Sequence, residues 1–281
     1  MTSMEYWQSI ILGIVEGITE FLPVSSTGHL TITESLLNLQ TDDPGVTAYT
    51  AIIQVGAIGA AIIYFWRDIV RIVVSFVRGL FSAHARQTAD WRLSLAVVIG
   101  SIPIAVVGLA LKNVIERDLR SLWVVAIALI VWSGVIVFAE RAATQQRGEH
   151  DVNPMDGLII GVVQVFALVP GVSRSGATIS AGLLRDLDRV TATRMSFFLG
   201  IPALTAAGAL EALDQRKVIP TTVGWGPTVV GIVVSFVVAY ATIAWLLRFV
   251  SGHSLIPFVW YRVILGGLLI VALATGFIAA T

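Results

Sequence analysis

Residues 16–29 of this chain read EGITEFLPVSSTGH and bring carboxylates, hydroxyls and an imidazole together in a very apolar sequence. Glu16 and Glu20 are one helical turn apart, so their side chains share a helix face. Two carboxylates on one face can hold a hard divalent cation or relay protons. If the helix lies shallowly in a membrane, both groups reach interfacial water instead. The spacing alone leaves all three readings open.

A hydroxyl and an imidazole follow the two carboxylates. His29 lies three residues after Ser26, on the same face if a helix begins near Ser25. Such a pair can supply a nucleophile and its base, or the His can act as general acid or phosphoryl acceptor. A lone His is more often structural, but the other three His fall in predicted loops. We therefore interpret His29 as functional.

A second polar stretch, GVVQVFALVPGVSRSGAT, covers residues 161–178. Serines at such a place often only cap a helix or allow close packing. Arg174 favours a site, because an arginine inside a membrane is costly and its planar fork suits phosphate oxygens. Helix N-termini with small residues also bind anions through free N–H groups. The two cradles that could approach a phosphate contain Ser25, Ser26 and Thr27, and Gly171, Ser173, Ser175 and Gly176.

The composition indicates which class of protein positions these groups. Hydrophobic residues make up 56% of the 281 residues and charged residues 13%, with a mean hydropathy of +0.86. Soluble domains carry about 25% charged residues, so we expect an integral membrane protein. The formal net charge of zero argues against a nucleic-acid partner. The absence of cysteine excludes disulfides, thiolate nucleophiles and Cys-based metal sites.

Eight apolar segments divide into two kinds. Two of them, 7–37 and 157–184, are interrupted by Pro, Gly and Ser, which predicts a helix, a loop and a second helix in each. A broken backbone at membrane depth survives only when it is buried in protein or lines a wet cavity, so we predict two re-entrant hairpins. The six segments predicted to span the membrane are 46–66, 93–111, 121–139, 195–210, 228–247 and 263–281.

The two broken segments match each other at a constant offset of 148 residues, which pairs Glu16 with Gln164 and Ser25 with Ser173. Each is followed by three predicted spans. We therefore predict an all-α polytopic membrane protein in which one membrane domain, 1–281, contains an inverted-topology repeat. The first copy covers about 1–140 and the second about 153–281.

The distribution of Lys and Arg predicts the orientation. If the loop 67–92 is cytoplasmic, twelve Lys and Arg lie in the cytoplasmic loops 67–92, 140–156, 181–194 and 248–262, and five lie in the opposite loops 112–120 and 211–227. Positive residues concentrate on the cytoplasmic side. The first hairpin then enters from the outer face and the second from the cytoplasm.

The motifs strongly resemble the two signature segments of the bacterial undecaprenyl pyrophosphate phosphatases, the bacitracin-resistance family. IIQVGAIGA (52–60) and RMSFFLGIP (194–202) follow in the family's order, so the resemblance covers the whole chain. It implies removal of the terminal phosphate of undecaprenyl pyrophosphate, which recycles the lipid carrier for cell-wall synthesis. It also implies re-entrant helices, a site open toward the outer face of the bacterial cytoplasmic (inner) membrane, and dependence on a divalent cation, Mg²⁺ or Ca²⁺.

Residue by residue, the resemblance implies a role for Glu16, Glu20, Ser26, His29, Ser173, Arg174 and Thr178. We expect Glu16 and Glu20 to hold the cation, and Arg174 to stabilise the phosphoryl group. Ser26 would attack, with His29 or Glu20 taking its proton. In the rival scheme, His29 or a metal-bound water is the nucleophile.

One other function class remains as an alternative, and a purely structural scaffold is disfavoured. An inverted repeat with broken helices also suits a transporter or flippase of a phosphate-headed polyprenyl lipid. A structural scaffold would give no reason to keep Arg174 and two glutamates in apolar segments. The expected partners are a polyprenyl diphosphate lipid and membrane lipid, with a homodimer as one form of assembly.

Overall fold

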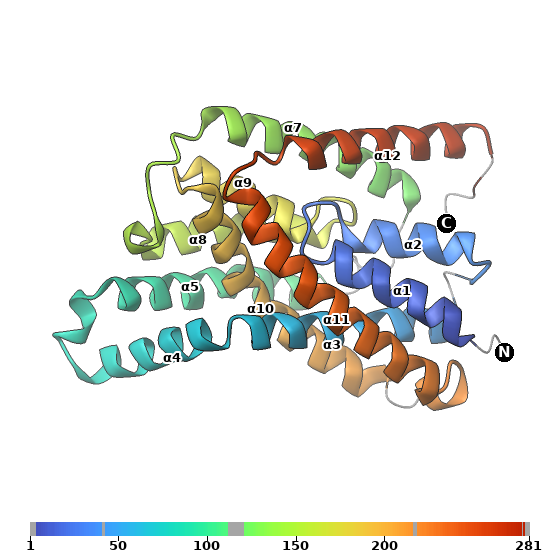
Figure 1. The fold of residues 1–281 in the computed structure, drawn as a ribbon, viewed down its shortest axis with the longest axis horizontal. Coiled ribbons are helices and arrows are strands. Elements are labelled where there is room, and N and C mark those ends of the chain that lie inside the picture. Colours follow the sequence, from blue (N-terminus) through green and yellow to red (C-terminus); the bar gives the residue numbers. More distant parts are fainter. Residues whose placement is uncertain (1–3, 41–42, 112–120, 216–217, 277, 279–281) are drawn as a thin grey trace. The chain divides into compact units, whose positions relative to one another are not determined.

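The computed structural model describes residues 4–40, 43–111, 121–215, 218–276 and 278 (Figure 1). Throughout these ranges the regular elements are helices, apart from a single β-bridge between Arg147 and Leu187. In chain order they are α1 (Tyr6–Thr19), α2 (Ser26–Leu36), α3 (Pro44–Tyr64), α4 (Trp66–Phe81), η1 (Ala85–Gln87), α5 (Ala89–Ala110), α7 (Leu122–Ala142), η2 (Glu149–Asp151), α8 (Pro154–Gln164), η3 (Val165–Leu168), α9 (Arg174–Leu184), α10 (Arg189–Gln215), η4 (Ile219–Thr221), α11 (Trp225–Val250) and α12 (Ile256–Ala274).

Six of the described helices are long and apolar enough to cross a bilayer, so this is an all-helical, multi-pass membrane protein. The six candidate spans are Pro44–Tyr64, Ala89–Ala110, Leu122–Ala142, Arg189–Leu210, Trp225–Val250 and Ile256–Ala274. They confirm the six predicted spans, with boundaries that differ by a few residues.

The last span differs most from its prediction. We predicted it from residue 263, using Arg262 as a boundary, but α12 begins at Ile256. Pro257 stands in the first turn, where its missing N–H costs no hydrogen bond and its fixed φ favours a helix. Arg262 is therefore inside a span and fully buried, and it was wrong to count it as a loop charge.

The described chain forms two compact units. Unit 1 contains Met1–Leu22, Ser26–Tyr64 and Ile201–Leu246, and unit 2 contains Pro23–Ser25, Phe65–Gly200 and Leu247–Thr281.

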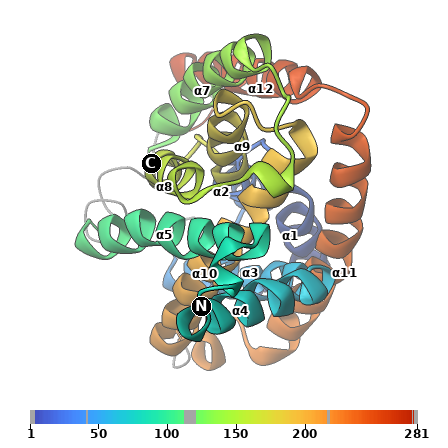
Figure 2. The same cartoon turned by 90° about the vertical axis from the view of Figure 1, so that its left-hand side faces the viewer.

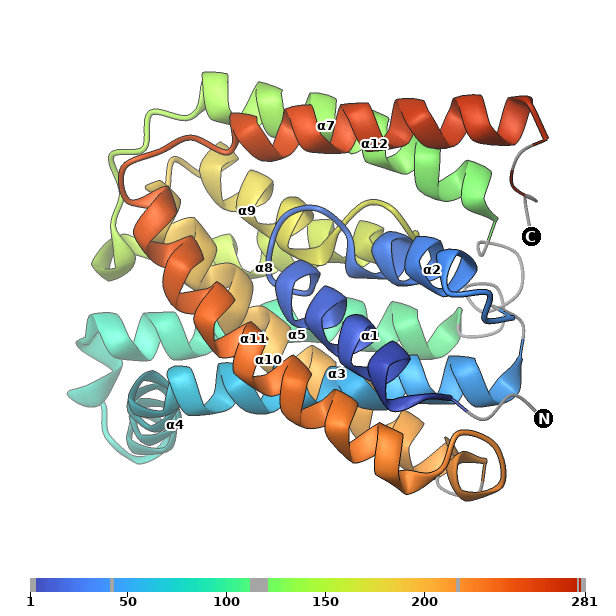
Figure 3. The same ribbon diagram turned by 45° about the vertical axis from the view of Figure 1, so that its right-hand side comes forward.

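In unit 1, α1 packs against α2 and α3 (Figure 3). Glycines on α1 allow a close approach to α11: a Cβ added at Gly17 would lie 2.8 Å from the carbonyl oxygen of Ser235. Small residues at membrane helix interfaces permit this kind of backbone contact. Close packing therefore holds α1, which contains Glu16 and is followed directly by Glu20, against its neighbours.

In unit 2, two pairs of helices lie side by side, α5 with α8 and α7 with α12 (Figures 1 and 2). The first pair meets through Gly100, Gly157 and Gly161, where an added Cβ would collide with facing backbone. α8 also packs against α9. The second polar motif, at the start of α9, therefore stands on a tightly packed frame.

An ion-pair network in unit 2 joins α4, η2 and α10. Glu149 accepts hydrogen bonds from Arg71 Nη2 (2.6 Å) and from Arg194 Nε (2.7 Å). Burial raises the pKa of Glu149, but the hydrogen bonds from the two arginines outweigh it and leave the pKa below its ordinary value of 4.5. In the folded protein, Glu149 is therefore ionised more readily than it is in the unfolded chain.

We expect Glu149→Gln to lower the free energy of unfolding by about 1–2 kcal/mol at pH 7, because two charge-assisted hydrogen bonds are weakened. The folded pKa is depressed, so this contribution is complete above about pH 4.5 and is lost as the pH falls through the folded value. Denaturant unfolding in micelles across pH measures the difference.

Asp90→Asn is the matched control, because Asp90 contacts the same network only through Arg71 Nη1 at 3.3 Å. We expect it to change stability by less than about 0.5 kcal/mol. A difference between Glu149→Gln and wild type that does not change with pH would contradict the assigned ion pair.

Candidate functional site

In unit 1, the hydroxyl of Ser26 meets a carboxylate. Ser26 is the first residue of α2, and its Oγ donates to Glu20 Oε2 at 2.8 Å. The same oxygen accepts a bond from Gln54 Nε2 at 3.3 Å. A hydroxyl held by a carboxylate is the arrangement of a nucleophile with an adjacent base.

Glu16 and Glu20 occupy one face of the end of α1, as their spacing predicted. The backbone N–H of Glu20 bonds to the carbonyl of Glu16 (3.0 Å), so the helical turn is intact between them. Their side chains are only 1% and 6% exposed. Both carboxylates therefore lie within the protein rather than at its surface.

His29 lies one turn further along α2, half-buried, and shares a face with Ser26. The hydroxyl of Ser26 is directed to Glu20. Of the two proton acceptors that we predicted for Ser26, the structure thus pairs Ser26 with Glu20. Gln54, which we did not predict as a site residue, joins the same carboxylate; its signal was a single amide inside an otherwise apolar span.

In unit 2, Arg174 is the first residue of α9 and reaches α10. Its Nη1 donates to the backbone carbonyl of Ser196 at 3.0 Å. Gly200, one turn further on, makes room for the guanidinium, because a Cβ there would collide with it. Thr178 Oγ1 lies 2.7 Å from Ser196 Oγ, which links the same two helices. Ser196 was missed because a single serine in a span carries no pattern.

Ser173 caps α9 before Arg174. Its Oγ accepts the N–H of Gly176 at 3.2 Å and lies 3.1 Å from Ser175 Oγ. Its φ of 75° is in the left-handed region that serine rarely adopts. Ser25, which precedes the start of α2, has the matching φ of 78°. Strained backbone of this kind clusters at functional sites, where the surrounding structure must hold it.

Arg262 holds both of these turns, and it was not among the predicted site residues. Its side chain is fully buried, and it makes four hydrogen bonds within unit 2. They run from Nη1 to Pro23 O (3.1 Å), from Nη2 to Gly171 O (3.0 Å) and Val172 O (3.1 Å), and from Nε to Ser133 Oγ (3.2 Å).

These contacts satisfy backbone that the helices leave unbonded. A buried carbonyl without a donor costs about 1–3 kcal/mol, and three such carbonyls converge here. Arginine is the side chain with enough donors, five N–H groups in a fixed fork, to serve them at once. Arg262 therefore fixes Pro23, just before Ser25, and Gly171 and Val172, just before Ser173.

The predicted residues divide between the units. Glu16, Glu20, Ser26, Thr27 and His29 belong to unit 1, and Ser25, Gly171, Ser173, Arg174, Ser175, Gly176 and Thr178 belong to unit 2. Thr27 is exposed on α2, whereas Ser175 and Thr178 are buried in α9.

The two carboxylates in unit 1, on Glu16 and Glu20, could supply ligands to a divalent cation such as Mg²⁺. No group of three or more His, Asp or Glu side chains able to hold a metal occurs in the part of the chain that the structure describes. Mg²⁺ usually binds one or two carboxylates and completes its shell with water and substrate phosphate. Glu16 and Glu20 therefore fit an ion that is shared with a phosphate-bearing ligand, and not a closed protein cage.

Comparison with known proteins identifies the family. A family model described as "Bacitracin resistance protein BacA" matches residues 9–268, which include both motifs. The chain belongs to the BacA family.

Relatives of this BacA family member resemble it over their full length. Undecaprenyl-diphosphatase 3 of Frankia casuarinae is 54% identical over 278 residues, covering 99% of this chain and 100% of the relative. Undecaprenyl-diphosphatase of Cutibacterium acnes is 55% identical, covering 95% of this chain and 96% of the relative. Undecaprenyl-diphosphatase of Mycobacterium marinum is 46% identical, covering 100% and 99%.

We expect Arg262→Met to lower the free energy of unfolding by about 3 kcal/mol or more, because it leaves buried carbonyls without donors. The loss should be local as well. In hydrogen exchange, the amides of residues 24–26 and 172–176 should exchange at least about tenfold faster.

Arg248→Met is the control, since Arg248 is an exposed arginine near the end of α11. Arg248→Met should leave both the free energy of unfolding and the amide exchange rates unchanged. If Arg262→Met exchanged at the wild-type rate in both turns, Arg262 would not be what holds them.

Proposed function

We propose that this chain hydrolyses undecaprenyl diphosphate to undecaprenyl phosphate and inorganic phosphate, recycling the lipid carrier and conferring bacitracin resistance. Family membership and relatives at 46–55% identity that are named undecaprenyl-diphosphatases support the reaction. The observation that carries the chemistry is the 2.8 Å hydrogen bond from Ser26 Oγ to Glu20 Oε2.

The proposed reaction has two displacements at the terminal phosphorus. In the first, Ser26 Oγ forms a bond to phosphorus, the bond to the bridging oxygen breaks, and Glu20 receives the hydroxyl proton. Undecaprenyl phosphate leaves. The proton held by Glu20 goes with this departing phosphate. In the second displacement, water attacks the phosphorus of the phosphoserine, and Glu20 takes a proton from the water and gives it to Ser26 Oγ as the bond between Oγ and phosphorus breaks, which releases inorganic phosphate.

Arg174 is proposed to bind the oxygens of the terminal phosphoryl group, with backbone N–H groups at the start of α9. A planar cation and oriented N–H groups stabilise charge that develops in phosphoryl transfer. His29 is proposed to orient the leaving oxygen. A divalent cation at Glu16 and Glu20 would neutralise charge on the diphosphate oxygens.

Chain continuity supports one shared substrate for both motifs. Ser25 is grouped with the second motif in unit 2, where Arg262 bonds Pro23 as well as Gly171 and Val172. Ser26 is joined to Ser25 by a peptide bond. Together with the family's two signature segments, this supports our proposal that Ser26 and Arg174 act on the same diphosphate.

We further propose the inverted repeat with re-entrant hairpins. α2 and α9 have equal lengths of 11 residues and start 148 positions apart, and α1 and α8 also start 148 apart. The left-handed serines before α2 and α9 share this offset. With the excess of Lys and Arg on one side, the site would open toward the outer face.

We expect cation-dependent phosphate release from undecaprenyl diphosphate by the purified protein in detergent micelles, where lipid flipping is impossible. Glu20→Gln and Arg174→Ala should each lower the rate of phosphate release by about 100-fold or more. The first substitution removes the base and the second removes a charge that acts in the transition state. Glu16→Gln should be milder, because Gln164 occupies the matching position in the second motif.

Arg248→Gln is the activity control and should release phosphate at the wild-type rate. Folded wild-type protein that binds the lipid but releases no phosphate would overturn the phosphatase and favour the carrier.

Rapid quenching during turnover of ³²P-labelled substrate tests the nucleophile. We expect an acid-stable phosphoserine at Ser26, absent from Ser26→Ala and retained at a reduced level in His29→Gln. An acid-labile, base-stable adduct on His29 would disprove attack by Ser26.

A further inference from the structure

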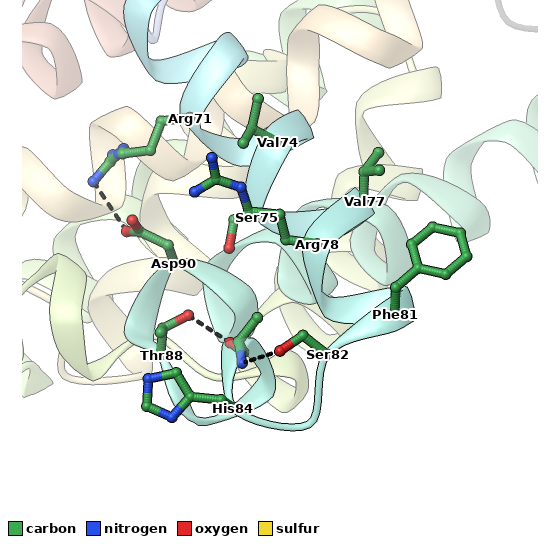
Figure 4. Close-up of a pocket in the computed structure, with 11 residues that line it drawn as sticks. Arg71, Val74, Ser75, Val77, Arg78, Phe81, Ser82, His84, Thr88 and Asp90 are labelled. Carbon is green, nitrogen blue, oxygen red and sulfur yellow. Dashed lines mark hydrogen bonds and ion pairs between the residues drawn. The ribbon is translucent and has the colours of Figure 1, made fainter.

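A pocket of about 650 Å³ lies between α4, η1 and the start of α5, all within unit 2 (Figure 4). None of the residues of the two motifs lines it. Its polar lining comes from Arg71, Ser75, Arg78, Ser82, His84, Thr88 and Asp90, and the carboxylate of Asp90 is paired with Arg71.

The helix beside this pocket is amphipathic. α4 has 16 residues and includes Arg67, Asp68, Arg71 and Arg78, so it is not one of the candidate spans. It nevertheless exposes large apolar side chains, among them Phe81 at 85%. In a multi-pass membrane protein, a helix with one charged face and one apolar face lies in the bilayer interface.

The basic side chains of the pocket differ in how many hydrogen bonds and ion pairs they make within the protein. Arg71 is bonded to Asp68, Asp90 and Glu149. The guanidinium of Arg78 and the ring of His84 are exposed and make no hydrogen bond or ion pair to the described residues. These two side chains have donors left for a ligand.

The pocket is polar on one side and apolar on the other. The guanidinium groups of Arg71 and Arg78 lie on one side, whereas the ring of Phe81 points to the opposite side (Figure 4). Val74, Val77 and Ala85 complete the apolar lining. A ligand that fits carries an anionic head and a hydrocarbon tail on the same molecule.

We propose that this pocket binds the phosphate headgroup of an anionic glycerophospholipid of the surrounding bilayer. Arg78 and His84 would donate to the phosphate oxygens, and the hydroxyls of Ser75 and Ser82 would contact the glycerol end. The acyl chains would run along Val77 and Phe81. Free phosphate would leave this apolar side unused, and a zwitterionic lipid would add a cation beside the arginines.

This inference does not rest on the proposed hydrolysis. α4 follows α3 in the first half of the chain, whereas in the second half the described residues between α10 and α11 form only the short 3-10 helix η4. The feature is therefore additional to the two matching motifs. Its expected effect is on lipid association and stability.

Native mass spectrometry of the purified protein, titrated with phosphatidylglycerol or phosphatidylcholine, tests the site. We expect wild type to retain phosphatidylglycerol at least about fivefold more tightly than phosphatidylcholine. The double variant Arg78→Gln/His84→Gln should bind phosphatidylglycerol about fivefold or more weakly than wild type. Its unfolding temperature in micelles should not change. Arg248→Gln, an exposed arginine away from this pocket, should bind like wild type.

Equal binding of the two lipids, or unchanged binding by the double variant, would overturn the proposal. Displacement of phosphatidylglycerol by millimolar inorganic phosphate would assign the site to free anions instead. Phosphate release by Arg78→Gln/His84→Gln in phosphatidylcholine bilayers should match wild type, so a failure here and a failure of the hydrolysis are distinguishable.

Discussion

The hydrogen bonds of Arg262 are the constraint on which the functional part of this structure depends. An apolar helix that stops inside a membrane protein exposes carbonyls that no water can serve. Arg262 donates to three of them, on Pro23, Gly171 and Val172. Both interruptions of the chain can therefore persist without water, and each leads directly into a new helix.

The helices that start there carry, at their first residues, the groups that we propose for the reaction. Ser26 opens α2 and Arg174 opens α9, each after a serine in the left-handed conformation. At these ends the backbone N–H groups are not used by the helix and the dipole favours negative charge. An undecaprenyl-diphosphatase needs these properties, because its substrate presents a diphosphate and its reaction concentrates charge on the transferred group.

Much of this could be predicted from the sequence, for reasons that differ between features. The six spans were predictable because bilayer thickness requires long apolar runs, and both motifs stood out as polar clusters in such runs. The start of α12 was not predicted correctly, because we assumed that a charged residue such as Arg262 must lie outside the span. Gln54, Ser196 and Arg262 were missed for a common reason: each is isolated in sequence, and each has partners that only the fold brings near. Gln54 contacts the Glu20 carboxylate and Arg262 contacts backbone carbonyls, whereas Ser196 contacts Arg174 and Thr178. The pairing of Ser26 with Glu20 rather than His29 likewise depends on how α2 packs against α1.

The central claim is that the carboxylate of the first motif and the guanidinium of the second act on one substrate, and a double-mutant cycle tests it directly. Glu20→Asp and Arg174→Lys shift each group without removing its charge, so phosphate release stays measurable in both single variants and in the double variant. Residues that act together on one transition state couple, and we predict an interaction of about 1 kcal/mol or more in kcat/KM. Effects that add within about 0.5 kcal/mol would show that Glu20 and Arg174 act independently and would contradict the account.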